Sequence, residues 1–225
     1  MRNQEEYSQI IDSIRSRLGS ARLMAVSKTR SVDEIDMVFK AGVNLFGENH
    51  VQEIVQKFSS YRPEGLELHM IGHLQSNKVS KVVPLVDMIE SIDSLELLEK
   101  VNACAQRNGK TMNVLLEYNT SSEASKSGFN SEASLFGCIE KGLSLDNIRI
   151  CGLMTVGPLE HPEKTEEAFS YLASLFHRCK EKYFADFPYF REISMGMSHD
   201  WPLAVKQGST LVRVGTAIFG ERKYV

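Results

Sequence analysis

Short apolar runs alternate with amphipathic helical patterns along nearly the whole chain, and this alternation restricts the fold more than any other feature. Strands that alternate with helices form parallel sheets, and strands that are covered on both faces are apolar throughout. The sequence therefore predicts an α/β fold. The expected strands are residues 23–26, 45–47, 68–71, 88–92, 113–117, 148–153, 192–195 and 211–214.

The number of strands favours a closed barrel. Eight strand-helix units in 225 residues average about 28 residues each, which fits a TIM (β/α)8 barrel with short loops. Ser31 and Glu34 form a capping-box pattern at the start of one expected helix, residues 31–41. No low-complexity linker interrupts the pattern, so we expect residues 1–225 to form a single domain. A doubly wound open sheet is the alternative, because one sequence does not define strand order.

Composition excludes several classes of protein. The net charge is −3 with acidic and basic residues interspersed, which does not give the positive field that nucleic-acid binding requires. No apolar stretch reaches the roughly 20 residues of a membrane span, and the polar start is neither a signal peptide nor a transit peptide. The four cysteines are widely spaced, so we expect reduced thiols and no metal site. These features predict a cytoplasmic protein.

Lys28 follows the apolar run at residues 23–26 and precedes a helix signal. A lysine in this position lies at the carboxyl end of a strand, where α/β proteins build their sites. Burial disfavours the charged form of a lysine and favours the neutral amine, which attacks carbonyl groups. Lys28 is therefore the first candidate for chemistry. A strand-end lysine with its ammonium group in water is the alternative.

The segments after the last two expected strands contain glycine and hydroxyl residues that suit an anion. Ser198 follows the seventh strand, where it could also cap the next helix, and Gly215 and Thr216 follow the eighth. TIM barrels frequently bind phosphate through loop amides in this region. Each segment alone is explained as a cap or a turn, but two on neighbouring strands favour a phosphate site.

Six motifs in order resemble the pyridoxal phosphate homeostasis protein family. The similarity extends from about residue 20 to residue 222, nearly the whole chain. The motifs are AVSKT at residues 25–29, FGEN at 46–49, HMIGHLQSNK at 69–78, GLMT at 152–155, SMGMSHD at 194–200 and VRVGTAIFG at 212–220.

This resemblance implies a single-domain TIM barrel similar to the barrel domain of fold-type III enzymes that use pyridoxal 5'-phosphate (PLP). It also implies that PLP is the cofactor and is held as a Schiff base. The residues that it assigns to PLP are Lys28 as the Schiff-base lysine, Ser198, Gly215 and Thr216 as phosphate ligands, Arg213 beside the pyridine nitrogen, and Asn49 and Met195 as pocket-lining positions.

The expected function is PLP homeostasis without catalysis, with possible supply of the cofactor to apoenzymes. Arg213 supports this expectation, because a cationic guanidinium favours an unprotonated ring nitrogen and so weakens the ring as an electron sink. Without the resemblance, Arg213 would be interpreted as a strand-end arginine in a surface ion pair. We expect a monomer with no catalytic and no metal-binding residues. A PLP-dependent amino-acid racemase is the alternative, although racemases of this fold add a second domain that we do not expect after Val225.

Overall fold

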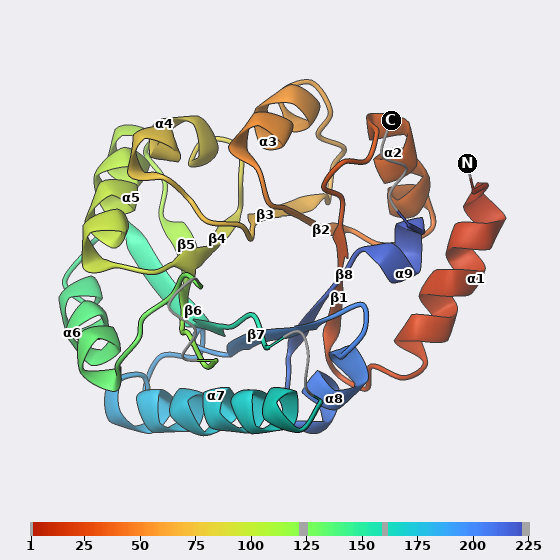
Figure 1. Ribbon diagram of the computed structural model, residues 1–225. Helices are drawn as coiled ribbons and strands as arrows, with labels where there is room; N and C mark the ends of the chain where they lie inside the picture. The colour runs from red at the N-terminus through yellow and green to blue at the C-terminus, as the bar shows by residue number, and fades with distance from the viewer. Residues whose placement is uncertain (1, 122–125, 159–161, 222–225) are drawn as a thin grey trace.

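The computed structural model describes residues 2–121, 126–158 and 162–221. Within this part of the chain, parallel strands form a closed barrel in the order β1 to β8, and β8 pairs with β1 (Figure 1). The TIM-barrel prediction is confirmed, and the open-sheet alternative is wrong because it would leave β1 and β8 unpaired. The strands are β1 (Arg22–Val26), β2 (Leu45–Glu48), β3 (Glu67–Met70), β4 (Met88–Ile92), β5 (Met112–Glu117), β6 (Ile148–Met154), β7 (Glu192–Met197) and β8 (Leu211–Val214).

Helices cover the outer face of the barrel (Figure 1). The predicted capping box is confirmed, since the Ser31 side chain accepts from the backbone N–H of Glu34 and the Glu34 carboxylate accepts from the backbone N–H of Ser31. The helices are α1 (Gln4–Arg15), α2 (Val32–Lys40), α3 (Val51–Phe58), the 3-10 helix η1 (Ser76–Lys78), α4 (Val79–Val82), α5 (Leu95–Arg107), α6 (Glu132–Gly142), α7 (Pro162–Tyr183), α8 (Trp201–Lys206) and α9 (Thr216–Phe219).

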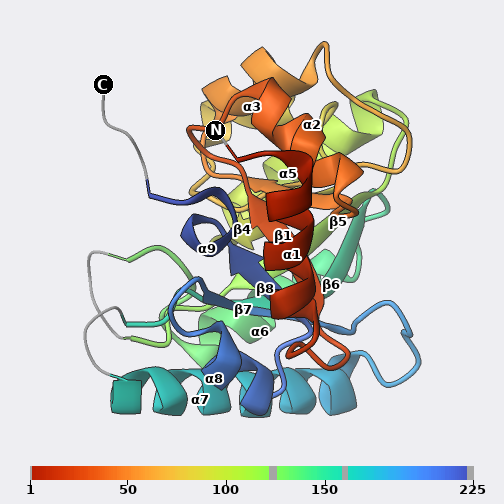
Figure 2. The same ribbon diagram turned by 90° about the vertical axis from the view of Figure 1, so that its right-hand side faces the viewer.

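The first helix completes this outer layer. Helix α9 is only one turn long, and α1 packs against both α9 and α2, in front of β1 in Figure 2. Its buried residues are Tyr7, Ile11 and Ile14, and the Tyr7 ring meets the Phe219 ring edge to face. The amphipathic pattern at the start of the chain therefore covers the strands that a short last helix leaves open.

The barrel interior holds polar as well as apolar side chains. Met88 belongs to a small apolar cluster separate from the main core, and Leu211 belongs to another. Side chains alternate along a strand, so Met88 shares its face of the sheet with Glu90, and Leu211 shares its face with Arg213. Both Glu90 and Arg213 are buried. The inward face of the sheet therefore carries a charged layer next to apolar clusters.

All four cysteines are buried and have free thiols, as the sequence predicted. Burial raises the pKa of Cys151 to about 11 and the pKa values of Cys138 and Cys179 to about 12. These thiols therefore stay protonated at neutral pH. In the described part of the chain, no helix combines the length and the apolar character that crossing a membrane would require.

Candidate functional site

A cavity of about 230 Å³ lies at the carboxyl ends of the strands. Six of the seven residues that the sequence assigned to cofactor binding line it together, and the exception is Met195. The lining residues are Val26, Lys28 and Arg30 from the end of β1 and its loop, Asn49 after β2, Ile71 after β3, Val156 after β6, Met197, Ser198 and His199 from β7 and its loop, and Arg213, Gly215 and Thr216 from β8 and its loop.

The prediction that Met195 lines the pocket is wrong. Ser194 points into the barrel, where it contacts Glu90 and Arg213, so its neighbour Met195 points to the outer face of the sheet. After Met195 the strand contains a bulge. The strand ends at Met197, and its pairing with β8 shifts register between Ser194 and Met197. Within this interval Gly196 has a φ of +91°, which favours glycine. The extra residue interrupts the alternation of side chains. Met197 therefore reaches the pocket, whereas Met195 is fully buried in the main hydrophobic core.

The Ser198 hydroxyl bridges two backbone amides at the start of α9. Its Oγ accepts from the N–H of Gly215 at 3.1 Å and from the N–H of Ala217 at 3.4 Å. The expectation that Ser198 caps the next helix is wrong, because α8 begins later, at Trp201, with Asp200 as its N-cap. Two backbone N–H groups that converge on one oxygen form a pair of donors, and a phosphate oxygen can accept hydrogen bonds from the same pair.

Arg213 places a buried cation in the pocket wall. It is only 4% exposed, its Nη1 donates to Ser194 Oγ at 2.6 Å, and its Nη2 donates to the Thr155 carbonyl at 2.7 Å. Burial lowers the pKa of Arg213, and the negative charges of Glu90 and Glu117 partly offset this. The alternative of a surface ion pair is therefore wrong. Because a guanidinium only donates hydrogen bonds, Arg213 offers a ring nitrogen a donor and no acceptor.

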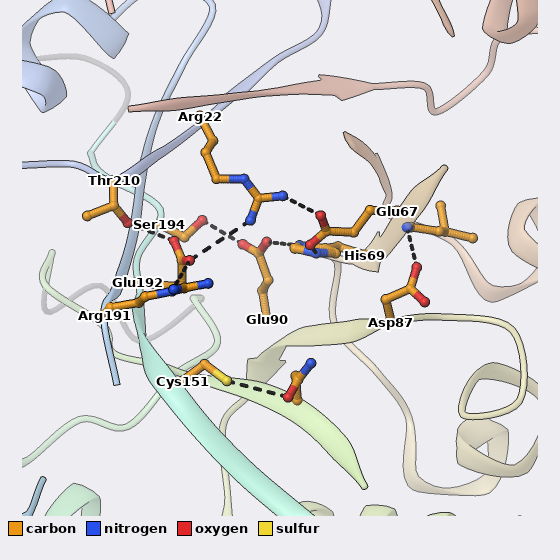
Figure 3. A network of polar contacts seen from close by, with 12 residues as sticks. Arg22, Glu67, His69, Asp87, Glu90, Cys151, Arg191, Glu192, Ser194 and Thr210 are labelled. Carbon is orange, nitrogen blue, oxygen red and sulfur yellow. Dashed lines mark hydrogen bonds and ion pairs between the residues drawn. The ribbon is translucent and has the colours of Figure 1, made fainter. Parts of the chain in front are cut away.

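A chain of polar side chains crosses the barrel interior between Arg22 and Ser194 (Figure 3). Ser194 Oγ donates to Glu90 Oε2 at 2.5 Å, and Glu90 Oε1 lies 2.6 Å from His69 Nδ1. His69 Nε2 lies 2.8 Å from Glu67 Oε1, and Arg22 pairs with Glu67. The path in Figure 3 thus runs from Arg22 on β1 to Ser194 on β7, where Arg213 contacts it.

The charges along this chain alternate. Burial alone would lower the pKa of His69, but hydrogen bonds with Glu67 and Glu90 outweigh burial and raise it to about 9. Burial alone would raise the pKa of Glu67, yet His69 and Arg22 lower it to about 2. Burial likewise acts to raise the pKa of Glu90, and the bond with His69 lowers it. At neutral pH His69 is therefore a cation between two carboxylates.

Asn49 lines the cavity and also has a buried polar atom without a partner. Its Oδ1 has no hydrogen-bond partner among the described residues, which costs about 1–3 kcal/mol for a buried group. Gly72 packs against the Asn49 backbone, and a Cβ at Gly72 would lie 2.2 Å from the Asn49 carbonyl oxygen. The position of the Asn49 backbone is therefore sterically fixed. Together with Lys28, Arg213 and the amide pair, this set of groups fits PLP.

Six lining residues were not assigned from the sequence. They are Val26, Arg30, Ile71, Val156, Met197 and His199. Each ends an expected strand or follows one within a few residues, so the rule that sites form after barrel strands would have included them. The bulge that turns Met197 rather than Met195 toward the pocket was not indicated by any sequence pattern.

Glu117 is a buried carboxyl group at the end of β5 that the sequence analysis also did not single out. Burial and the nearby charge of Asp93 raise its pKa to about 7, and Arg213 opposes this rise only in part. Among the described residues, Glu117 is not one of those that line the cavity. It is therefore a titratable group beside the pocket wall.

Comparison with known proteins agrees with this geometry. Residues 4–223 match the family model described as the N-terminal domain of alanine racemase. A pyridoxal phosphate homeostasis protein from Vibrio cholerae is 40% identical across 99% of this chain and 96% of the relative. The chain belongs to the pyridoxal phosphate homeostasis protein family. The resemblance that the six motifs indicated is thereby confirmed.

Solved structures place the family within a wider group of barrels. The structure of PipY from Synechococcus elongatus with PLP bound is 34% identical, with a TM-score of 0.85, and covers 95% of this chain and all of that chain. An alanine racemase from Clostridium difficile has a TM-score of 0.77 at 15% identity, a likeness of fold alone. This chain matches 61% of the length of that racemase.

Proposed function

We propose that the protein binds PLP in this pocket and serves intracellular PLP homeostasis without catalysing a reaction. The observation that carries the proposal is the convergence of Lys28, Arg213 and the amide pair at Ser198 on one cavity. An amine, a buried cation and an anion site suit the aldehyde, the pyridine nitrogen and the phosphate of PLP. The PLP-bound structure of the relative PipY supports the proposal.

Each group in the pocket then has a separate task. When bound, PLP supplies an aldehyde that reacts with amines and a ring that withdraws electrons. Lys28 would hold the aldehyde covalently, and Arg213 would donate to the ring nitrogen. Asn49 would contact the ring. Ser198, Gly215 and Thr216 would hold the phosphate through hydroxyl and amide donors.

The absence of catalysis is part of the proposal, and Arg213 supports it. Ser194 and Thr155 hold its guanidinium in place, and a cation there favours an unprotonated ring nitrogen, which withdraws electrons less strongly. Racemisation also requires an acid or base on the side of the substrate opposite Lys28. Glu117, with a pKa of about 7, is the observation that favours the racemase alternative. It does not line the described cavity, so we favour the binder.

We also propose that the protein acts as a monomer in the cytoplasm and passes PLP to apoenzymes. His199 and Thr216 line the pocket and are exposed, so the pocket is accessible from outside. Free buried thiols are typical of a reducing compartment.

Lys28→Ala is expected to abolish covalent retention of PLP. The wild-type protein, loaded with PLP and reduced with borohydride, should gain the mass of one cofactor, and the modified peptide should contain Lys28. The variant should keep its circular dichroism spectrum and show no stable adduct. A reduced adduct on another lysine in the wild-type protein, with none at Lys28, would refute the proposed function.

PLP-loaded protein is expected not to turn over amino acids. We expect deuterium exchange at Cα of L-alanine or D-alanine in D2O to proceed at the rate of free PLP, because positioned acids and bases each contribute about 10²–10⁴-fold to such reactions and we assign such a role to Lys28 alone among the described residues. The measurement is mass spectrometry of the recovered alanine. Fast exchange that disappears in Lys28→Ala and in Glu117→Gln would establish the racemase alternative.

A further inference from the structure

Lys57 is a buried lysine in the last turn of α3, outside the pocket. It is 7% exposed, and its Nζ donates to Glu48 Oε1 at 2.9 Å and to Glu53 Oε2 at 2.6 Å. The same Nζ donates to the Ser27 carbonyl oxygen at 2.9 Å. All three ammonium donors of Lys57 therefore have acceptors, and one of them is the backbone of the residue before Lys28.

The two carboxylates that pair with Lys57 also hold the residues on both sides of Lys28. Ser27 Oγ donates to Glu48 Oε1 at 2.8 Å, and the backbone N–H of Thr29 donates to Glu53 Oε2 at 2.6 Å. Thr29 has a φ of +64°, which a β-branched residue rarely adopts. Such a conformation persists only where its surroundings enforce it. The Thr29 N–H donates to Glu53, and Lys57 in turn holds Glu53 in place.

We propose that Glu48, Lys57 and Glu53 are positioning residues for Lys28. By holding Ser27 and Thr29, they fix the backbone from which the Lys28 side chain extends. The inference rests on the proposed function, because it concerns the attachment of Lys28 to an aldehyde. In that step the Lys28 nitrogen forms a bond to the aldehyde carbon, and the aldehyde oxygen leaves as water.

The electrostatics of the trio agree with a fixed geometry. Burial raises the pKa of Glu48, and the charge and hydrogen bond of Lys57 oppose this rise. Burial also acts to raise the pKa of Glu53, but the bonds from Lys57 and the Thr29 N–H lower it. Removal of Lys57 would leave two neighbouring carboxylates without their shared cation, so both would move. The restraint on each side of Lys28 would then be lost.

The experiment compares two matched pairs of variants. Lys57→Met and Glu53→Ala each remove one member of the trio. Lys40→Met and Asp36→Ala each break a similar (i, i+4) pair on α2, in which Lys40 is exposed and Asp36 is half-buried. Each protein is mixed with PLP, and borohydride stops the reaction at set times. Mass spectrometry then gives the rate of covalent attachment at Lys28. Affinity for pyridoxine 5'-phosphate, whose alcohol cannot react with an amine, is measured separately.

We expect Lys57→Met and Glu53→Ala to slow attachment roughly ten- to a hundredfold, since small misplacements of a reacting group cost rates of that order. Their affinity for pyridoxine 5'-phosphate should stay within about twofold of the wild type, because the phosphate contacts lie elsewhere in the pocket. The α2 variants should match the wild type in both measurements. Glu53 is partly exposed, so its variant provides the test if Lys57→Met does not fold.

Two results would overturn the inference. One is an unchanged attachment rate in both trio variants. The other is an equal loss of attachment rate and of affinity for pyridoxine 5'-phosphate, which would mean that the trio only stabilises the fold. Failure of the proposed function is distinguishable from both, because in that case the wild-type protein itself would form no adduct at Lys28.

Discussion

Glu90→Gln is expected to lower the free energy of unfolding by about 3–5 kcal/mol, which is typical when one partner of a buried ion pair is removed. Glu90 is fully buried, and its two oxygens contact His69 and Ser194. Glutamine keeps the shape but not the negative charge, so His69 and Arg213 would remain as buried cations without it. Urea unfolding at pH 7 measures the loss, which would be a large part of the ~5–15 kcal/mol of a typical domain.

Glu132→Gln is the matched control for Glu90→Gln. Glu132 accepts from Arg178 Nη1 at 2.6 Å, and this bond, with one from Tyr171, lowers the pKa of Glu132 to about 2. The pair is exposed, however, and exposed pairs contribute only about 0–1 kcal/mol. The control should therefore be nearly as stable as the wild type. Similar losses in the two variants would contradict the assigned role of Glu90.

The free energy of unfolding is also expected to fall by about 3 kcal/mol between pH 6.5 and pH 9, as His69 loses its proton. Its pKa rises from 6.5 to about 9 on folding, and each unit corresponds to about 1.4 kcal/mol. Because the folded pKa is the higher one, the stabilisation is complete below pH 6.5 and is lost as the pH rises through 9. Urea unfolding at several pH values measures this slope.

Other buried carboxyl groups act in different pH ranges. The folded pKa of Glu67 is about 2, so its stabilisation is present above pH 4.5 and is lost as the pH falls toward 2. The folded pKa of Glu117 is raised to about 7, so the stabilisation that comes from its bound proton is present below pH 4.5 and is lost as the pH rises through 7. A Glu117→Gln background therefore isolates His69. Adding His69→Gln should flatten the profile above pH 7, and an unchanged slope would show that another group titrates.

Most of the fold was predictable because its signals are local. Each apolar run became a strand, since a parallel strand covered on both faces needs apolar residues throughout. Lys28, Ser198, Gly215 and Thr216 were placed at the cavity for a related reason, since the segments that follow barrel strands meet at one end, whereas Asn49 and Arg213 were assigned from the resemblance. Lys28 is the clearest case, because its position follows directly from the end of β1.

The remaining features depend on contacts that sequence patterns do not show. Glu90 and Ser194 are 104 residues apart, and their hydrogen bond exists only because the barrel closes. Met195 was assigned from the resemblance alone, whereas the inward position of Ser194 turns Met195 into the main core and the bulge at Gly196 brings Met197 to the pocket instead. Lys57 follows Glu53 by one helical turn, a spacing typical of an ordinary surface pair. Its burial against Ser27 comes from the packing of α3 on the barrel.

The hydrogen bonds of Ser198 have a consequence for how a ligand leaves the pocket. The Ser198 hydroxyl already accepts from the amides of Gly215 and Ala217, so an arriving phosphate would have to replace it as their acceptor. The free energy gained would then be only the difference between a phosphate oxygen and a hydroxyl as acceptor. When the phosphate leaves, the Ser198 hydroxyl would again accept from both amides. The two N–H groups would then have an acceptor with or without the ligand. In the proposed role as a PLP carrier, this arrangement would lower the energetic cost of release, and retention would depend on the proposed bond at Lys28.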